Sequence, residues 1–135
     1  LARYAVADLF LDTFPYTAHT TGSDALWMGC PLVTRTGETF PSRVAGSLLH
    51  AFGVPELVTE TADAYEALAF DLAHDPVRLA GLRSLLLDRR ATTPAYDTPR
   101  FARHLEQAFE TMWVLHRTGQ PSRPIQVMPV QPTNA

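Results

Sequence analysis

The 135-residue sequence has very little cysteine: Cys30 is its only one, so an internal disulfide is excluded. Secreted domains commonly depend on disulfides, and a single cysteine therefore favours a reducing compartment. No apolar run approaches the roughly 20 residues that a helix needs to cross a bilayer, and no secretory signal is visible. We predict a cytoplasmic protein with no membrane partner, in which Cys30 is a small buried apolar residue.

The sequence also has little net charge. The formal net charge is −3, from 11 basic and 14 acidic residues. Nucleic-acid backbones bind to strongly basic surfaces, so this balance argues against nucleic acid as the main partner. Hydrophobic residues make up 46% of the chain and charged residues 19%. That composition is typical of a globular domain with a core.

Several motifs are missing as well. The sequence lacks the dinucleotide pattern Gly-x-Gly-x-x-Gly and the Walker loop. Its 5 histidines are scattered, with no pair four residues apart and no cysteine partner, so we predict no metal site. A triad of His19, Ser23 and Asp24 is excluded, because side chains this close on one helical turn cannot form the required chain of hydrogen bonds.

The first half of the chain alternates short apolar runs with helical repeats. The pattern predicts strands at residues 8–13, 31–34 and 55–59, and helices at 19–28 and 41–52. Gly29 and Gly53 follow these helices, in the position that glycine prefers. The order βαβαβ predicts the α/β class, a parallel sheet with covering helices.

The second half predicts only helices. Thr61, Asp75 and Thr98 occupy helix-start positions, the last two directly before proline. The long helix at 98–118 is amphipathic, and the proline-rich residues 121–135 predict an extended tail. We expect a solvated helix end at residues 89–90, and tryptophans that belong to the core at 27 and 113.

Three strands are few for a free-standing sheet of this kind. The sequence also begins without Met, inside the helix-like run of residues 1–7. We therefore expect a piece of a longer protein, with more sheet upstream.

Polar residues follow the first predicted strand and open the first predicted helix. Open α/β sheets bind ligands beyond the carboxyl ends of their strands. Thr20 and Thr21 offer hydroxyls and free N–H groups to a diphosphate at the helix start, and Asp24 offers a carboxylate to a ribose diol. Spacing alone leaves an alternative open, an ordinary helix start with a hydroxyl cap, in which His19 is structural.

Two stretches carry a resemblance to a known family. Together they resemble the catalytic region of O-linked N-acetylglucosamine transferases, the bacterial homologues in particular, and the resemblance runs from about residue 1 to about residue 118. The stretches read His19-Thr20-Thr21-Gly22-x-Asp24-x-Leu26-Trp27-x-Gly29-x-Pro31-x-Val33-Thr34 and Gly37-Glu38-Thr39-x-x-Ser42-Arg43-Val44-Ala45-x-Ser47.

The resemblance implies an architecture. The family has a two-lobed GT-B fold preceded by tetratricopeptide repeats, and this chain resembles the last part of the C-terminal, Rossmann-like lobe. Residues 1–59 are then the nucleotide-sugar-binding part, residues 60–120 the C-terminal helices and residues 121–135 an extended tail. We expect these parts to work with the upstream remainder of the same protein.

The resemblance also implies an activity. It is the inverting, metal-independent transfer of N-acetylglucosamine from the donor UDP-GlcNAc to Ser/Thr hydroxyls of acceptor proteins, without a cofactor. The segment is not expected to be active alone, and no catalytic residue is assigned within it. Two alternatives stay open: a UDP-sugar epimerase, and a non-catalytic nucleotide-sugar-binding protein.

The family's site residues map onto the motif. His19, Thr20 and Thr21 are expected to contact the UDP diphosphate and the sugar, and Asp24 the uridine ribose. The preceding loop departs from the Cys- and Asn-bearing loop of the animal enzymes, which puts Tyr16 where the sugar's acyl group would lie. The family's phosphate-binding lysine is expected upstream.

Overall fold

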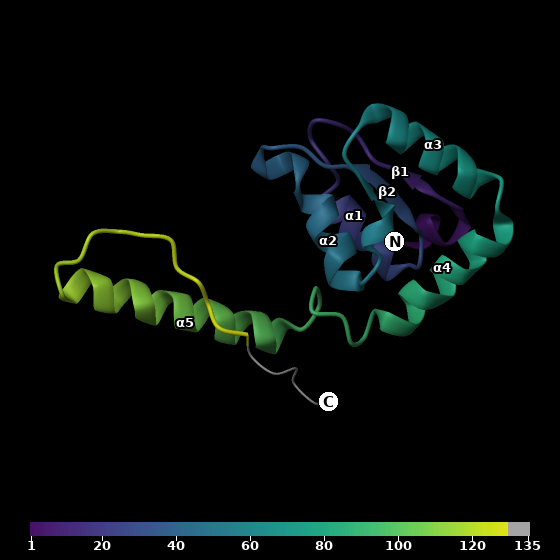
Figure 1. Cartoon of the computed structure of the whole chain (residues 1–135). Helices are drawn as coiled ribbons and strands as arrows, with labels where there is room; N and C mark the ends of the chain where they lie inside the picture. The colour runs from purple at the N-terminus through teal and green to yellow at the C-terminus, as the bar shows by residue number, and fades with distance from the viewer. Residues whose placement is uncertain (130–135) are drawn as a thin grey trace. The chain divides into compact units, whose positions relative to one another are not determined.

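Three short parallel strands lie at the centre of the N-terminal part of the chain (Figure 1). They are β1 (Phe10–Leu11), β2 (Leu32–Arg35) and β3 (Val58–Thr59), in that order across the sheet. Phe10 pairs with Leu32, and Thr34 pairs with Val58. The parallel α/β arrangement expected from the sequence is therefore present, with strands shorter than predicted.

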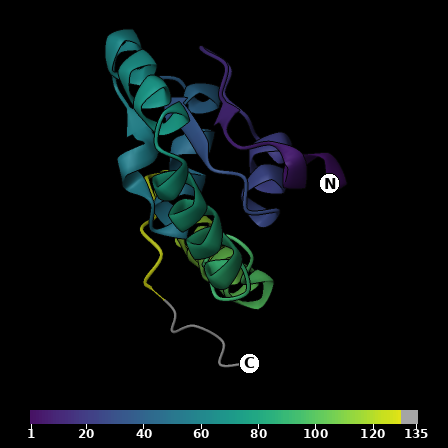
Figure 2. The same cartoon turned by 90° about the vertical axis from the view of Figure 1, so that its right-hand side faces the viewer.

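The computed structural model describes residues 1–129, which divide into one unit at residues 1–93 and a second at residues 94–129. In the first unit, α1 and α2 pack on one face of the sheet and α3 packs on the other, with α4 running on from α3 (Figures 1 and 2). The helices are α1 (Thr20–Trp27), α2 (Val44–Phe52), α3 (Ala62–Ala73) and α4 (Pro76–Arg89). Single 3-10 turns lie at Ala2–Val6, Phe40–Ser42 and Pro55–Leu57.

The core of the first unit fills the space between the sheet and its helices. Its largest fully buried apolar side chains come from β2, from each of the four helices and from the segment between α2 and β3. They are Leu26, Leu32, Val33, Leu49, Phe52, Val54, Leu57, Leu72 and Leu86. Burying each such side chain contributes about 1.5–3 kcal/mol. Cys30 is fully buried, as predicted.

Glycine allows α1 to lie close to the sheet. A Cβ on Gly22 would lie 3.2 Å from the Cβ of Ala18 and 3.4 Å from a methyl of Leu32. Such contacts are tight, so a larger residue at this position would push α1 away from β2. The absence of a side chain at residue 22 thus allows α1 to pack closely against β2.

The helix ends follow the sequence signals closely. Gly29 and Gly53 adopt left-handed φ values of 76° and 72°, as helix-terminating glycines do. Thr61 and Asp75 cap α3 and α4 through their side chains. One cap was predicted one residue late: Asp97, not Thr98, accepts the capping bond from the N–H of Arg100.

The expectation about the tryptophans is wrong, and the one about the solvated helix end is incomplete. Trp27 and Trp113 are 38% and 60% exposed, so neither belongs to the core. Arg89 is exposed, as predicted for a solvated helix end, and both arginines also make contacts. Arg89 donates to the carbonyls of Phe52 and Gly53 at 3.0 and 2.9 Å, and Arg90 lies over the ring of Trp27.

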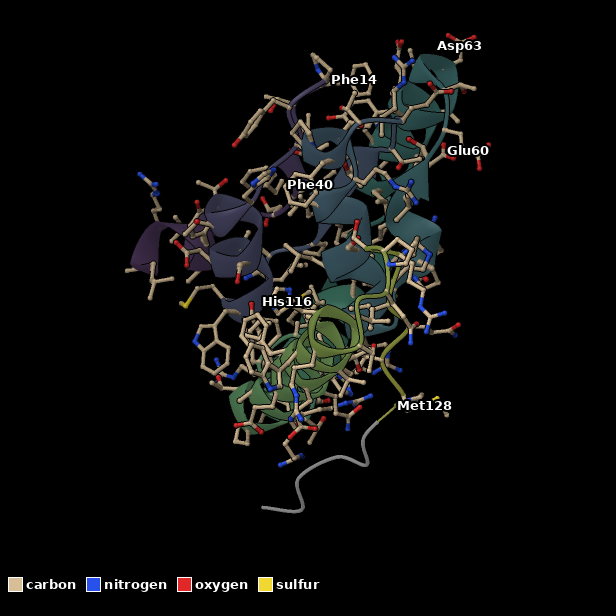
Figure 3. All side chains as sticks on the ribbon, turned by 90° about the vertical axis from the view of Figure 1, so that its left-hand side faces the viewer. Phe14, Phe40, Glu60, Asp63, His116 and Met128 are labelled. Atoms are coloured by element: carbon tan, nitrogen blue, oxygen red, sulfur yellow. The ribbon has the colours of Figure 1, made fainter. Side chains whose placement is uncertain are left out.

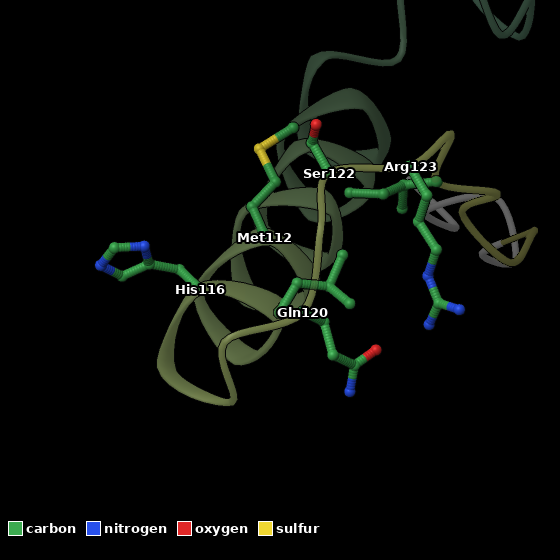
Figure 4. A pocket seen from close by; sticks show the side chains of 7 residues that line it. Met112, His116, Gln120, Ser122 and Arg123 are labelled. Atoms are coloured by element: carbon green, nitrogen blue, oxygen red, sulfur yellow. The ribbon is translucent and has the colours of Figure 1, made fainter.

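The second unit consists of α5 (Thr98–Arg117) and the segment that follows it. Residues 121–129 contain neither helix nor strand. They turn back along α5 and enclose a hollow of about 350 Å³ against Met112, Leu115 and His116 (Figure 4). The remainder of the predicted tail, residues 130–135, lies outside the described residues. Within the described chain, no helix is long and apolar enough to span a membrane.

Candidate functional site

Two loops meet beyond the carboxyl ends of the strands, one between β1 and α1 and the other between β2 and α2. Thr17 in the first loop donates both its N–H and its hydroxyl to the carbonyl of Pro41 in the second, at 3.0 and 2.6 Å. The same hydroxyl accepts the N–H of Ala45 at 3.3 Å, at the start of α2. The two loops are thus neighbours, as their places after parallel strands predict.

A buried carboxylate lies beneath the first loop. Asp12 Oδ1 accepts the N–H of Thr13 at 2.8 Å and the N–H of Ala18 at 2.7 Å. Its Oδ2 accepts the hydroxyl of Thr34 in β2 at 2.6 Å. Buried carboxylates need such donors to offset the loss of water. One side chain therefore fastens both ends of the loop to each other and to the neighbouring strand.

The start of α1 is open. Its N-cap residue is His19, and no side chain caps it. The first intrahelical bond joins the N–H of Ser23 to the carbonyl of His19 at 3.0 Å, so the N–H groups of Thr20, Thr21 and Gly22 have no acceptor within the helix. Both threonines are exposed. The hydroxyl-capped helix start that the sequence left open is therefore wrong for α1.

His19 lies within a group of aromatic rings. Its ring stacks on Tyr16, with centroids 4.7 Å apart and planes at 17°, and meets Phe40 edge-on at 6.2 Å and 87°. Tyr16 and Phe40 are 62% and 79% exposed. Figure 3 shows Phe14 and Phe40 on the two loops that follow β1 and β2. The Nε2 atom of His19 is buried and has no hydrogen-bond partner among the described residues.

Asp24 lies one turn further along α1 than a capping acid would. It is the fifth residue of the helix, and the first turn contains no acidic residue. The side chain is half-buried, and no described residue hydrogen-bonds its carboxylate. A contribution of Asp24 to the helix dipole is consequently small, because that effect falls off within the first turn.

Arginine supplies every positive side chain of the protein, since none of its 11 basic residues is lysine. The guanidinium carbon of Arg35, at the end of β2, lies 4.2 Å from the ring centre of Phe14. The Nε atom of Arg35 is buried and has no hydrogen-bond partner among the described residues. Arg43 and Glu38, which both belong to the second motif stretch, are exposed.

Burial alters the acidity of two side chains in this unit. It raises the pKa of Tyr65, and the nearby charge of Asp12 raises it further. The Tyr65 hydroxyl donates to the backbone carbonyl of Asp12 at 2.9 Å. Burial also raises the pKa of the Cys30 thiol, although Arg83 acts in the opposite direction. Among residues 1–129, no group of three or more His, Cys, Asp or Glu side chains is arranged to hold a metal ion.

Sequence reasoning missed the residues that build the loop. Asp12 closes an apolar run that reads simply as a strand, Thr17 and Phe40 belong to no motif, and Thr34 stands in the motif only as the end of a predicted strand. One signal was available for Asp12, because a lone acid at the carboxyl end of an otherwise apolar strand is unusual in a buried position. The role of Phe40 could not be found this way, since its contact with His19 joins residues from different loops.

Comparison with known protein families identifies the family of this chain. The family model described as "Glycosyl transferase family 41" matches residues 1–105. The chain belongs to glycosyl transferase family 41. The chain is also similar to the UDP-N-acetylglucosamine–peptide N-acetylglucosaminyltransferase of Caenorhabditis elegans, 39% identical over 119 residues, which are 88% of this chain and 10% of that protein.

Two further comparisons agree with this family. The probable UDP-N-acetylglucosamine–peptide N-acetylglucosaminyltransferase SPINDLY of Hordeum vulgare is 42% identical over 113 residues, covering 84% of this chain and 12% of that protein. A solved structure of a mutant O-GlcNAc transferase from Thermobaculum terrenum matches with a TM-score of 0.81 at 38% identity, covering 87% of this chain and 23% of that one. The predicted fold class and family are confirmed. The chain spans about a tenth of the length of its curated relatives.

Proposed function

We propose that this chain carries the donor site of a protein O-glycosyltransferase, which transfers N-acetylglucosamine from UDP-GlcNAc to Ser/Thr hydroxyls of proteins. The observation that carries the proposal is the open start of α1. Three N–H groups without helical acceptors lie beside two exposed threonines, at the carboxyl end of a parallel sheet. Such a helix start favours a negatively charged group.

Each predicted site residue has a role in this proposal. Thr20 and Thr21 bind the diphosphate through N–H and hydroxyl groups, and His19 contacts the diphosphate and the sugar end. Asp24, whose carboxylate is left without a described partner, accepts the hydroxyls of the uridine ribose. Tyr16, exposed at the loop tip and stacked on His19, contacts the sugar and its acyl group.

The chemistry follows from where charge develops. The acceptor oxygen forms a bond to the anomeric carbon while the bond from that carbon to the diphosphate oxygen breaks, with inversion. The electron pair of the breaking bond goes to the diphosphate, and the acceptor proton goes to a base outside this chain. N–H groups fixed at the start of α1 stabilise the departing charge without a metal ion, because they need no reorganisation during the reaction.

Substitution of Asp24 tests the donor site. In the natural protein carrying this chain, we expect Asp24→Ala to raise the Kd for UDP at least tenfold, about 1.4 kcal/mol, because two ribose hydrogen bonds are lost. Isothermal titration calorimetry measures the change. Asp88→Ala, an exposed aspartate on α4, is the matched control and should bind like wild type. UDP affinity unchanged in Asp24→Ala would contradict the assigned role.

Labelled UDP-GlcNAc, supplied to the same protein with a pool of Ser/Thr peptides, tests the reaction. Label transferred to peptide supports the proposal. An isomerised nucleotide sugar would instead identify an epimerase, and binding without any turnover would identify a non-catalytic binding protein. Offering other UDP-sugars in parallel tests whether N-acetylglucosamine is the preferred donor.

A further inference from the structure

We infer that Asp12 is a positioning residue of the donor site, one that acts through the loop at residues 13–18 and touches no substrate itself. The inference rests on the proposed function. Asp12 lies outside the residues that the motif singles out, and its side chain is buried beneath the loop. Its place in the hydrogen-bond network of the loop is what assigns it the role.

We call the hydrogen bonds of the Asp12 carboxylate to Thr13, Ala18 and Thr34 the clasp. One oxygen, Oδ1, accepts N–H groups from the first residue of the loop, Thr13, and from the last, Ala18, at 2.8 and 2.7 Å. The other oxygen accepts the hydroxyl of Thr34 at 2.6 Å, which fixes the carboxylate to the central strand. Ala18 directly precedes His19, so the clasp sets the position at which α1 begins.

Further contacts carry this constraint to the loop tip. The hydroxyl of Thr13 donates to the carbonyl of Tyr16 at 2.7 Å, and Thr17 is bonded to the second loop through the carbonyl of Pro41. Tyr16 then stacks on His19. The rings and the open N–H groups are therefore placed before any donor arrives. A site held in this way loses less conformational entropy on binding than a loop that must order itself.

Conservative and drastic substitutions separate position from charge. Asp12→Asn keeps an oxygen for the two N–H groups and an NH₂ for the Thr34 hydroxyl oxygen, so we expect a change in UDP affinity below threefold. Asp12→Ala leaves both N–H groups without an acceptor, and we expect UDP affinity to fall at least tenfold. Thr93→Val removes another buried threonine hydroxyl, bonded at 2.8 Å to the carbonyl of Ala51. It is the control for general destabilisation.

A double-mutant cycle tests whether Asp12 acts through the loop. We compare Asp12→Ala, His19→Ala and the double variant by UDP calorimetry. If Asp12 works by placing His19 and the start of α1, Asp12→Ala should reduce UDP affinity by a factor at least threefold smaller in the His19→Ala background than in the wild type. The inference would be overturned if the fold-loss in UDP affinity of the double variant equalled the product of the two single fold-losses. It would also be overturned if Asp12→Ala bound UDP like wild type.

Hydrogen exchange distinguishes failure of this inference from failure of the proposed function. Asp12→Ala should speed exchange at the amides of Thr13 and Ala18 at least tenfold, whereas Asp12→Asn should leave both close to wild type. This readout needs no donor. Wild-type protein that fails to bind UDP would refute the proposed function alone. Unchanged exchange at both amides in Asp12→Ala, with the fold intact, would refute the clasp.

Discussion

At the scale of single residues, Tyr65 and Cys30 show how burial alters proton affinity. Both pKa values are raised, chiefly by burial, so the folded state holds these protons to higher pH than the unfolded state does. The stability that these two groups contribute is therefore fully present below their unfolded pKa values, about 8.5 for cysteine and about 10 for tyrosine. It is lost as the pH rises through and above those values.

We accordingly expect the free energy of unfolding to fall between about pH 8 and pH 11. The range is well suited to measurement, since no lysine titrates there. Urea titrations at a series of pH values measure the slope, and the double variant Cys30→Ala/Tyr65→Phe should flatten it. A free energy of unfolding that rises over this range would contradict the expectation.

From the sequence, only the motif assigns the proposed donor-site residues. Spacing alone did not separate Thr20 and Thr21 from ordinary capping residues. In the structure neither α1 nor α2 has a side-chain cap, whereas α3, α4 and α5 are each capped by Thr or Asp. Thr20 and Thr21 are therefore not side-chain caps of α1. Asp12 was not predictable in its role, since its partners at residues 18 and 34 come together only when the loop closes and β2 pairs with β1.

At the scale of elements, the glycines give a matched pair of tests. Gly81 lies within α4 with nothing within 4 Å of an added Cβ, whereas a Cβ on Gly29, at a φ of 76°, would lie 2.8 Å from Leu87. We expect Gly81→Ala to stabilise the fold by about 0.5–1 kcal/mol. Gly29→Ala should destabilise it by at least about 1–2 kcal/mol, the usual left-handed penalty.

Chemical denaturation of both variants checks this pair. Equal effects of the two substitutions would show that the left-handed turn after α1 has no special requirement for glycine. The comparison is informative because both changes add the same methyl group to the same unit. Only the local backbone conformation and the neighbour at residue 87 differ.

Local chemistry predicted the helix ends well and the helix contacts poorly. Thr61, Asp75, Gly29 and Gly53 act within one turn of their own position, so sequence is enough to interpret them. Arg89 acts at a distance. It donates to the carbonyls at the end of α2, and nothing in the sequence of α4 indicates which neighbour its last turn will meet.

At the scale of the whole molecule, the two tryptophans report on different units. Trp27 belongs to α1 in the first unit, which holds the extensive core, and Trp113 belongs to α5. Within residues 94–129, only Leu115 is buried. Because most helical stability in proteins comes from tertiary packing, a helix with so little packing is weakly stabilised.

We therefore expect thermal unfolding of this chain to differ between the two probes. Fluorescence of Trp113→Phe, which retains Trp27, should show one steep transition that coincides with the loss of tertiary structure. Fluorescence of Trp27→Phe, which retains Trp113, should change gradually with temperature. Identical midpoints and slopes for both variants would contradict separate behaviour of the units.

The order of elements was predictable because hydrophobic period and caps repeat along the chain. The exposure of α5 was not. Its apolar stripe reads as one face of a packed helix, yet Phe101, Phe109 and Met112 are more than half exposed. Amphipathic spacing establishes that a face is apolar and leaves open what that face contacts.

The clasp beneath the loop at residues 13–18 has an evolutionary consequence. The backbone of the loop is fixed from below by Asp12 and from the side by Thr17, while the Tyr16 side chain at the tip is 62% exposed. In the proposed donor site, the shape of the loop and the selectivity for the donor therefore depend on separate positions. Under that proposal, we expect a substitution at the tip to change which donor sugar is accepted without disturbing the loop backbone, so that single mutations can alter donor preference.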